Sequence, residues 1–379
     1  MTPRTVLLVH SSSGRYGADR QLSLIARGLD GRRYRPHVVL PAAGPLADEL
    51  SAAGVPVTIR SLAVVRRELM RPAGLARLAA SLAADAAMLG RLARALDAAL
   101  VHSNTSVVLG GAAAARWAGV PHIWHVREIY SRFGRIWPAH RRLLLSAAAL
   151  PCVSRATAAQ FGDAAKARVL YDGLPATPKR ASRSQARATL GLPEGVPVVA
   201  VLGRISDWKG QDVLVRALAT PALAAVGAIG VLAGDPWPGA ESRLESVRAL
   251  AAYLGVTDRL RVLGFRPDVE NVLGAADVVV VPSTAPDPLP NSALEAAAAG
   301  CPVVAADHGG LPEIVREGVS GRLVAPGDAQ ALADAVRSLI DDPAGAARLG
   351  TAATEDVRAR FAPARLLGEL QELYDELSR

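Results

Sequence analysis

The sequence predicts an α/β protein made of two Rossmann-like, doubly wound domains that face each other across a cleft. The chain has 379 residues, more than a single hydrophobic core usually supports. Short apolar runs alternate with longer Ala- and Leu-rich stretches, and short connections join them, which is typical of βα units around a parallel sheet. The runs are continuously apolar, and this favours strands that are buried on both faces.

The expected strands fall into two sets. In the first half of the chain they are Thr5–His10, His37–Leu40, Val55–Arg60, Ala99–His102, His122–Val126, Leu150–Val153 and Arg168–Tyr171. In the second half they are Val196–Leu202, Ala228–Ala233, Arg261–Leu263, Asp277–Val281 and Pro302–Ala305. A stretch rich in Pro, Arg, Ser and Ala lies between the two sets and predicts a linker.

Four segments follow from this division. We expect an N-terminal Rossmann-like domain at 1–175, a linker at 176–195 and a C-terminal Rossmann-like domain at 196–360. The last segment, 361–379, has leucines at helical spacing and no strand after it. A lone terminal helix needs a surface that covers its leucines, so we expect it to pack back on the N-terminal domain.

The composition is that of a globular protein, with 50% hydrophobic and 21% charged residues. The two cysteines, Cys152 and Cys301, lie in apolar runs, and we interpret them as buried thiols rather than a disulfide or a metal site. The N-terminus enters a strand-like run without a signal peptide, and no apolar stretch reaches the ~18 residues of a membrane span. These observations predict a cytoplasmic protein.

Positive charge is concentrated in the first half. Residues 1–180 contain 25 Lys and Arg against 10 Asp and Glu, whereas residues 181–379 carry a net charge of −7. Two interpretations stay open, an anionic partner or a solvated polar face. The arginines are not interleaved with aromatic residues and no nucleic-acid motif is present, so we expect no nucleic acid as partner.

One candidate for the anionic partner is a membrane surface. Arginines alternate with leucines along Val64–Leu82, and a second group lies further on in the same half. The arginines are Arg66, Arg67, Arg71, Arg77, Arg132, Arg135, Arg141 and Arg142. An Arg-rich amphipathic surface can rest on anionic lipid, which makes the inner membrane face a candidate place of peripheral contact. The alternative is a helix packed on the domain with its arginines in water.

The richest motif in the sequence is Pro282–Glu295. A strand ends there in a turn-rich loop, and Asn291 or Ser292 is expected to cap the helix that follows. Asp287 lies in the loop and Glu295 about one turn into the helix, so both carboxylates are expected at the strand-end crevice, where they suit sugar hydroxyls. The alternative is two ordinary acidic residues that flank a cap.

A second motif, Val201–Gly210, also joins a strand to a helix. It places two cations, Arg204 and Lys209, in one loop, where backbone N–H groups and the helix dipole also favour anions. In physical terms this predicts a cradle for a diphosphate. Lys209 is one of only three lysines in the chain. The alternative is a solvated loop with incidental charge.

Taken together, these motifs resemble the family-4 retaining glycosyltransferases of GT-B architecture, which carry a Gly-Arg-x4-Lys-Gly loop and an acidic-x7-Glu motif. The resemblance covers nearly the whole chain. Further matching segments are Gly17–Leu22, Trp124–Glu128, Tyr171–Gly173, Gly264–Arg266 and His308–Glu313. Each segment alone is weak, but their order and spacing together are specific.

The resemblance implies a metal-independent hexosyltransferase that needs no cofactor. Its donor would be a nucleoside-diphosphate sugar, UDP favoured over GDP, and its acceptor, bound on the N-terminal side, a lipid-linked or glycan molecule. Arg204 and Lys209 would bind the diphosphate, Asp287 and His125 the transferred sugar, Glu295 the ribose, and Phe265 and Arg266 the base. Gly14 and Gly17 would let the first loop approach the phosphates because glycine has no Cβ. Gly203, Leu289, Asn291 and Ser292 complete the donor-binding set.

Two departures from the family pattern fall in the sugar half of this site. Asp287 stands where the family usually has Glu, and Leu289-Pro290 stands where it usually has Phe-Gly. Pro290 has no N–H group, so one backbone donor to a sugar hydroxyl is missing. The nucleotide half therefore matches the pattern more fully than the sugar half.

Other classes of function remain as alternatives. A dinucleotide-dependent oxidoreductase would need Gly-x-Gly-x-x-Gly after the first strand, and residues 11–17 do not provide it. A nucleotide-sugar epimerase would share the cleft and the donor. A catalytically weak relative that only binds a sugar nucleotide would fit the altered sugar pocket. No carboxylate pair is placed for the double displacement of retaining hydrolases, and the resemblance implies front-face attack instead.

Overall fold

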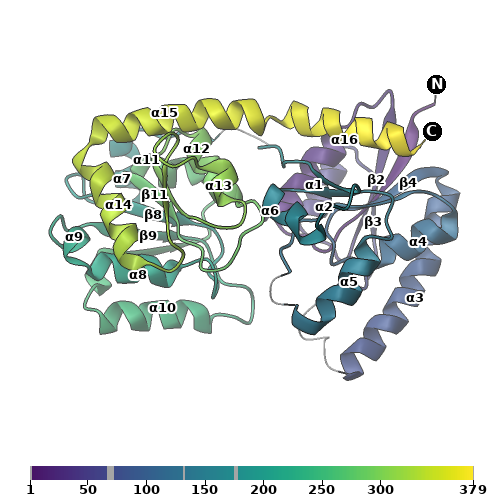
Figure 1. Cartoon of the computed structure of the whole chain (residues 1–379), viewed down its shortest axis with the longest axis horizontal. Coiled ribbons are helices and arrows are strands. Elements are labelled where there is room, and N and C mark those ends of the chain that lie inside the picture. Colours follow the sequence, from purple (N-terminus) through teal and green to yellow (C-terminus); the bar gives the residue numbers. More distant parts are fainter. Residues whose placement is uncertain (1, 66–71, 131–132, 175–177, 379) are drawn as a thin grey trace. The chain divides into compact units, whose positions relative to one another are not determined.

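A computed structural model of the chain describes residues 2–65, 72–130, 133–174 and 178–378. The chain divides into two compact units (Figure 1). The first unit comprises Met1–Pro175 and Phe361–Arg379, and the second comprises Ala176–Arg360. Each unit is an open parallel sheet with helices on both faces. The predicted fold class, two doubly wound α/β domains, is therefore confirmed.

The sheet of the first unit has the strand order β3-β2-β1-β4-β5, and all its pairs are parallel. Its strands are β1 (Arg4–Val9), β2 (Tyr34–Leu40), β3 (Val57–Ile59), β4 (Ala98–Ser103) and β5 (His122–Trp124). Two more strands, β6 (Leu150–Cys152) and β7 (Ala167–Val169), pair with each other, and isolated parallel bridges join the β6 side of this pair to Ile123 of β5 and to Val126. The helices are α1 (Gly17–Gly28), α2 (Pro45–Ala52), α3 (Pro72–Ala95), α4 (Gly110–Ala118), α5 (Trp137–Leu144), α6 (Arg155–Ala158) and α16 (Pro363–Leu377).

The two faces of this sheet have separate cores. Successive side chains of a strand point to opposite faces, so Val6 and Leu8 of β1 pack with α1, α2 and α16, whereas Leu7 and Val9 pack with α3 and α4. Both pairs are fully buried, which explains why the run is continuously apolar.

The terminal helix α16 belongs to the first unit and lies beside α1 (Figure 1). Leu366, Leu370 and Leu373 are buried in the same core as Val6 and Leu8. Each such leucine contributes roughly 1.5–3 kcal/mol of burial free energy. Polar contacts fix the helix as well, because Asp375 pairs with Arg4 at 2.5 Å. The helix is thus an integral part of the first unit.

The second unit repeats this plan with the strand order β10-β9-β8-β11-β12-β13. Its strands are β8 (Val198–Leu202), β9 (Ile229–Ala233), β10 (Leu260–Gly264), β11 (Val278–Val281), β12 (Val303–Ala306) and β13 (Arg322–Val324). Its helices are α7 (Arg183–Leu190), α8 (Gln211–Ala219), α9 (Pro221–Ala224), α10 (Ser242–Tyr253), α11 (Val269–Ala275), α12 (Asn291–Ala298), α13 (Leu311–Ile314), α14 (Ala329–Asp341) and α15 (Pro343–Arg360). Asp328 caps α14 by accepting a hydrogen bond from Ala331 N–H at 2.9 Å.

Cys152 and Cys301 are free, buried thiols, as predicted, and burial raises their pKa values to about 12 and about 11. None of the helices in the described ranges is both long and apolar enough to cross a membrane.

In each sheet the chain adds strands first on one side of the first strand and then on the other. Ligands of such sheets bind at this switch point, outside the carboxyl ends of the strands.

Candidate active site

In the second unit the switch point lies between β8 and β11. The loop after β8 carries Arg204 and Lys209, and the loop after β11 carries Asp287. The two sequence motifs, about 80 residues apart, therefore meet at the edge of the sheet where a ligand is expected.

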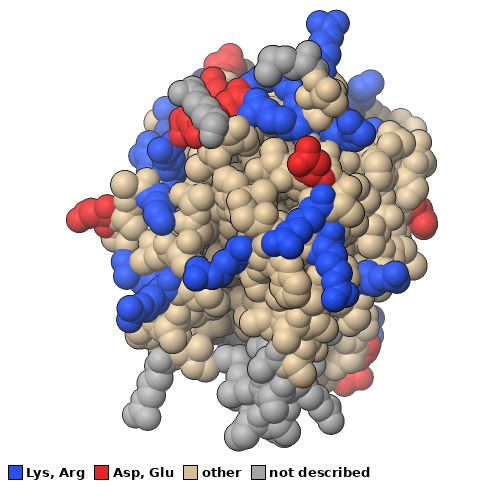
Figure 2. Space-filling model, turned by 90° about the vertical axis from the view of Figure 1, so that its right-hand side faces the viewer, with Lys and Arg blue, Asp and Glu red and all other residues tan. Residues whose placement is uncertain are grey.

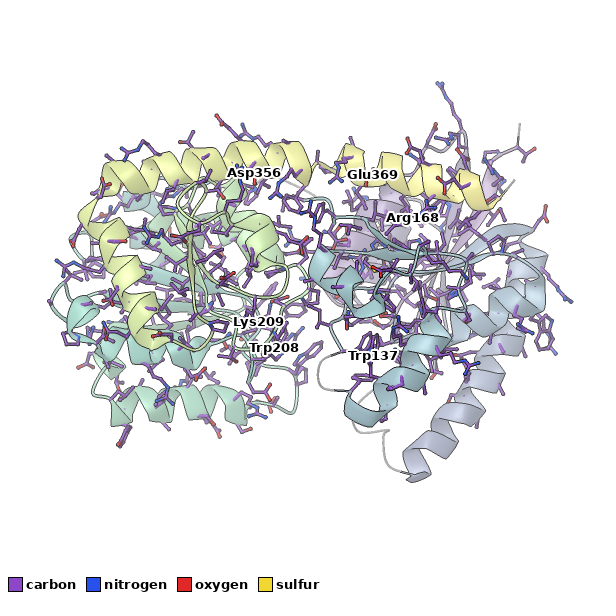
Figure 3. The ribbon with its side chains drawn as sticks, viewed as in Figure 1. Trp137, Arg168, Trp208, Lys209, Asp356 and Glu369 are labelled. Atoms are coloured by element: carbon purple, nitrogen blue, oxygen red, sulfur yellow. The ribbon has the colours of Figure 1, made fainter. Side chains whose placement is uncertain are left out.

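An ion pair joins the two loops across this switch point. Lys209 Nζ lies 2.6 Å from Asp287 Oδ2, and the two side chains are 19% and 6% exposed. The ammonium also lies over the ring of Trp208, 4.5 Å from its centroid, and Figure 3 shows the two neighbouring side chains at this loop. The diphosphate candidate and the sugar candidate are thus in direct contact.

The second cation of the loop, Arg204, stacks on an aromatic ring. Its guanidinium carbon lies 3.3 Å from the centroid of Trp237, in the loop after β9. The backbone of Arg204 is held as well, because Gln211 Nε2 donates to its carbonyl oxygen at 3.0 Å. Arg204 is therefore fixed from two sides.

Glycine allows the loops to pack this closely. Gly210 has φ +75°, and a Cβ atom there would lie 1.8 Å from the carbonyl oxygen of Pro282. At the other side of Asp287, Gly310 N–H donates to its carbonyl oxygen at 2.7 Å. Gly309 has φ +61°, and its Cβ would lie 2.4 Å from the same oxygen. No side chain fits at these positions, so glycine is required on both sides of the site.

The helix that follows the Asp287 loop begins differently from the prediction. Asn291 and Ser292 do not cap α12, because Pro290 takes the N-cap position and no side-chain hydrogen bond is made there. Asn291 and Ser292 instead supply the first two N–H groups of the helix. Glu295 is 7% exposed one turn further on, and Leu289 is equally buried. An N-terminus without a side-chain cap keeps its backbone donors for a ligand.

The residues expected to meet the base lie after β10. Phe265 is 42% exposed. Arg266 forms a bidentate ion pair with Asp268, at 2.8 and 2.6 Å. Its guanidinium is therefore oriented by a neighbour before any ligand is present. Since β10, β9 and β8 are adjacent, the loops with Phe265, Trp237 and Arg204 follow one another along the sheet edge.

The first unit has a polar cluster at its own switch point, between β1 and β4. Asn104, after β4, donates to His10 Nδ1 at 3.2 Å, and His10 Nε2 lies 3.0 Å from Asp19 Oδ1. Because Nδ1 accepts, Nε2 carries the hydrogen and donates to the carboxylate. Burial raises the pKa of Asp19, but the hydrogen bonds from His10, Ser12 and Tyr16 outweigh it, so the net shift is downward.

His125 follows β5 and is fully buried in the first unit. Burial, followed by the charge of Arg127 and the nearby His102, holds its pKa well below the usual value, so the imidazole is neutral at pH 7. It stacks on His102, with ring centroids 5.4 Å apart, and Tyr374 of α16 lies 2.6 Å from His102 Nδ1. The helix α16 therefore contacts His102, the ring on which His125 stacks.

Arg127 joins the Asn104 cluster to Asp172. Its guanidinium contacts both carboxylate oxygens of Asp172 and donates to the carbonyl oxygen of Asn104 at 2.9 Å. Burial raises the pKa of Asp172, and the charge of Arg127 only partly offsets the shift. Burial also raises the pKa of Glu128. These partners were not assigned to the site from the sequence, although the segments that contain them match the family pattern.

The two glycines of the first loop lie next to Asp19. Gly17 begins α1, and a Cβ atom at Gly14 would lie 3.0 Å from Asp19 Oδ2. The expected site residues thus form two groups. Gly14, Gly17 and His125 belong to the first unit, and the other expected residues belong to the second. Within the second, the structure brings Lys209 and Asp287 into contact.

The basic surface is described only in part. Arg66, Arg67, Arg71 and Arg132 lie outside the described residues, as do the side chains of Arg77 and Arg135. Arg141 donates to the carbonyl oxygen of Phe161 at 2.5 Å, whereas Arg142 is exposed beside Leu143, itself 40% exposed. Figure 2 shows basic side chains spread across one face of the first unit, with few acidic ones among them.

Two family models match the chain. The model "Glycosyltransferase Family 4" matches residues 16–176, and the model "Glycosyl transferases group 1" matches residues 182–356. Together they cover most of the two described units.

Curated relatives match part of the chain. The D-inositol 3-phosphate glycosyltransferase of Nocardia farcinica is 41% identical over 172 residues, which is 44% of this chain and 38% of that protein. The enzyme of the same name from Mycolicibacterium smegmatis is 38% identical over 196 residues, 51% of this chain and 43% of that protein. The matched region thus spans less than half the length of these relatives.

Solved structures match over the whole chain. Anabaena HepE in complex with UDP-glucose has a TM-score of 0.83 at 28% identity, covering 98% of this chain and 100% of that one. Sucrose-phosphate synthase from Thermosynechococcus elongatus has a TM-score of 0.78 at 20% identity, covering 99% of each chain; at this identity it shows the fold alone. From the two family models, the matching structures and the motifs at the switch point, this chain belongs to the family-4 glycosyltransferases of GT-B architecture.

Proposed function

We propose that the chain is a retaining hexosyltransferase that uses a nucleoside-diphosphate sugar, with UDP as the favoured nucleotide. The observation that carries the proposal is the Lys209–Asp287 ion pair at 2.6 Å, made by the loop that also carries Arg204, at the switch point of the second unit. HepE, which was solved with UDP and UDP-glucose, supports UDP. The relatives named for D-inositol 3-phosphate suggest a hydroxyl of a cyclitol or sugar as acceptor.

Lys209 has a double role in this proposal. An ammonium group has three N–H donors, so Lys209 can keep its bond to Asp287 and still donate to a phosphate oxygen. The donor thereby arrives at a cation that is already oriented. Asp287, held from Lys209 on one side and through its backbone by Gly310 on the other, would accept hydrogen bonds from hydroxyls of the transferred sugar.

The chemical step follows from where charge develops. When the anomeric C–O bond breaks, its electron pair goes to the diphosphate and the sugar becomes oxocarbenium-like. Arg204, Lys209 and the N–H groups at the start of α12 bind the growing negative charge more strongly than the ground state, which accelerates the step. The acceptor oxygen then bonds to the anomeric carbon on the face that the diphosphate leaves, and its proton passes to a diphosphate oxygen. The anomeric configuration is kept.

A donor panel tests this proposal. UDP-glucose, UDP-galactose, UDP-N-acetylglucosamine and GDP-mannose are each incubated with the protein, with and without inositol or simple glycosides, and nucleotide release is measured. We expect one UDP-sugar to dominate, turnover to survive EDTA, and product NMR to show the donor's anomeric configuration. An inverted linkage or a requirement for divalent metal would contradict the mechanism, and no release with any donor would contradict the function.

We further propose that the basic surface of the first unit, here called its basic face, contacts anionic lipid through α5. Exposed Arg142 and Leu143 of α5, near the 44% exposed Ile136, combine positive charge with apolar surface. In co-sedimentation we expect binding to vesicles that contain anionic lipid and none to neutral vesicles. Binding should fall with salt, because exposed charges are screened over ~10 Å at 0.1 M.

The matched variants of this experiment are Arg142→Glu and Arg248→Glu. Arg248 is an exposed arginine of α10 in the second unit, so its reversal changes the net charge equally without touching the basic face. Arg142→Glu should weaken binding and Arg248→Glu should not. Equal effects of the two variants, or no binding at low salt, would refute a specific basic face.

A further inference from the structure

Trp237, at the edge of the second sheet, is a large aromatic side chain that is mostly exposed. It is 57% exposed, although burial is the normal state of so large an apolar ring. Its position is nevertheless defined, because the guanidinium of Arg204 lies against the ring face at 3.3 Å from the centroid. An exposed tryptophan that stacks on an arginine indicates a role for that contact.

The backbone places the ring there. Ile205 N–H donates to the carbonyl oxygen of Asp235 at 3.0 Å, and Ile205 and Pro236 form a parallel bridge. The two loops approach so closely that a Cβ atom at Gly234 would lie 2.1 Å from the carbonyl oxygen of Gly203. The loop after β9 is thus joined in register to the loop after β8, and Trp237, two residues beyond Asp235, lies over Arg204.

Stacking on a ring suits the chemistry of a diphosphate contact. A guanidinium group is planar, and its five N–H donors lie in the plane, so a ring against its face does not block hydrogen bonds made in the plane. An arginine held in one orientation also loses less conformational entropy when it binds a ligand. A lysine in the same place would be oriented less by the ring, since its charge is compact and its donors rotate.

We propose that Trp237 is a positioning residue for Arg204: its ring orients the guanidinium so that the N–H edge meets the donor diphosphate. The inference rests on the proposed function of the Arg204–Lys209 loop. In this role Trp237 acts on the diphosphate and not on the base. The strand order β10-β9-β8 puts the Trp237 loop between that of Phe265 and that of Arg204, and the guanidinium covers one face of the ring.

Calorimetry with uridine, UMP and UDP tests the proposal on the full chain. Trp237→Ala should weaken UDP binding by about 3- to 30-fold, the range of a cation–π contact, and should leave uridine binding almost unchanged. Trp237→Phe should restore most of the affinity, because a smaller ring still covers the guanidinium. Trp117→Ala, which removes a 40% exposed tryptophan of the first unit, is the control and should change nothing.

A double-mutant cycle then assigns the effect to Arg204. If Trp237 acts through Arg204, Trp237→Ala should have little effect on UDP binding in an Arg204→Ala background. In the ligand-free protein, the side-chain NMR signals of Arg204 should shift when the ring is removed. Unshifted signals, an additive cycle, or an equal loss of uridine affinity would each overturn the proposal. Absence of UDP binding in the native protein would instead overturn the proposed function, and the diphosphate role of the stack with it.

Discussion

Arg204→Ala should slow nucleotide release from the preferred donor by a factor on the order of 10²–10³, the cost of removing one donor that binds developing charge in a transition state. The fold should survive, because Arg204 lies in a loop and its side chain packs on the half-exposed ring of Trp237. The loss should appear in kcat as well as in kcat/KM, since the diphosphate gains charge only as the bond breaks.

The control for this variant is Arg248→Ala, which removes an exposed arginine of the same unit. Circular dichroism and thermal unfolding of both variants should match the native protein. Turnover of Arg204→Ala within a few-fold of native would exclude Arg204 from the diphosphate site, whatever happens to the other residues of the loop.

Lys209→Ala should have a comparable effect on turnover together with a large effect on stability. The side chain of Asp287 is only 6% exposed, and its carboxylate loses its cationic partner in this variant. Breaking a buried ion pair by removing one partner typically costs about 3–5 kcal/mol. Lys209 is itself more exposed than Asp287, so Asp287→Asn, which leaves the ammonium near water, should destabilise less than Lys209→Ala. Urea unfolding measures both changes.

The double variant Lys209→Ala/Asp287→Asn separates the two effects. A neutral amide at 287 removes the unpaired buried charge, so part of the lost free energy of unfolding should return. Turnover should stay low, because neither the cation nor the carboxylate is restored. Equal instability of the double variant and Lys209→Ala would show that the ion pair is not the source of the cost. Recovery of turnover would remove both residues from the proposed mechanism.

The central strands were predictable because they are buried on both faces, as in the Val6–Val9 and Val278–Val281 segments. Each apolar run named from the sequence overlaps a strand. The strand that was not predicted, β13, has only three residues and is half-buried at the sheet edge. Such a strand has no apolar run to mark it, since it depends on pairing with β12.

The candidate site was predictable to the extent that its residues follow strands. The carboxyl ends of adjacent parallel strands meet at one edge, so placing Lys209 and Asp287 after strands implied the contact that the structure shows. The predicted cap of α12 was wrong. Asn and Ser are the usual N-cap residues, but here the preceding Pro290 takes that position with extended backbone. The sequence does mark Trp237 as a rare aromatic in a Gly- and Pro-rich loop, but its contact with Arg204 depends on the register between two loops.

The place of α16 has a consequence for the order of folding during synthesis. The core of the first unit contains Leu366, Leu370 and Tyr374, so that unit cannot complete its packing until Tyr374 has been made. The intervening unit, Ala176–Arg360, contains all its own strands and is finished earlier. At about 5–20 residues per second, the N-terminal strands wait on the order of ten seconds or more for the helix that covers them. The half of the chain that is made first is therefore the last to become native, and its exposed apolar face is the one that a chaperone would meet.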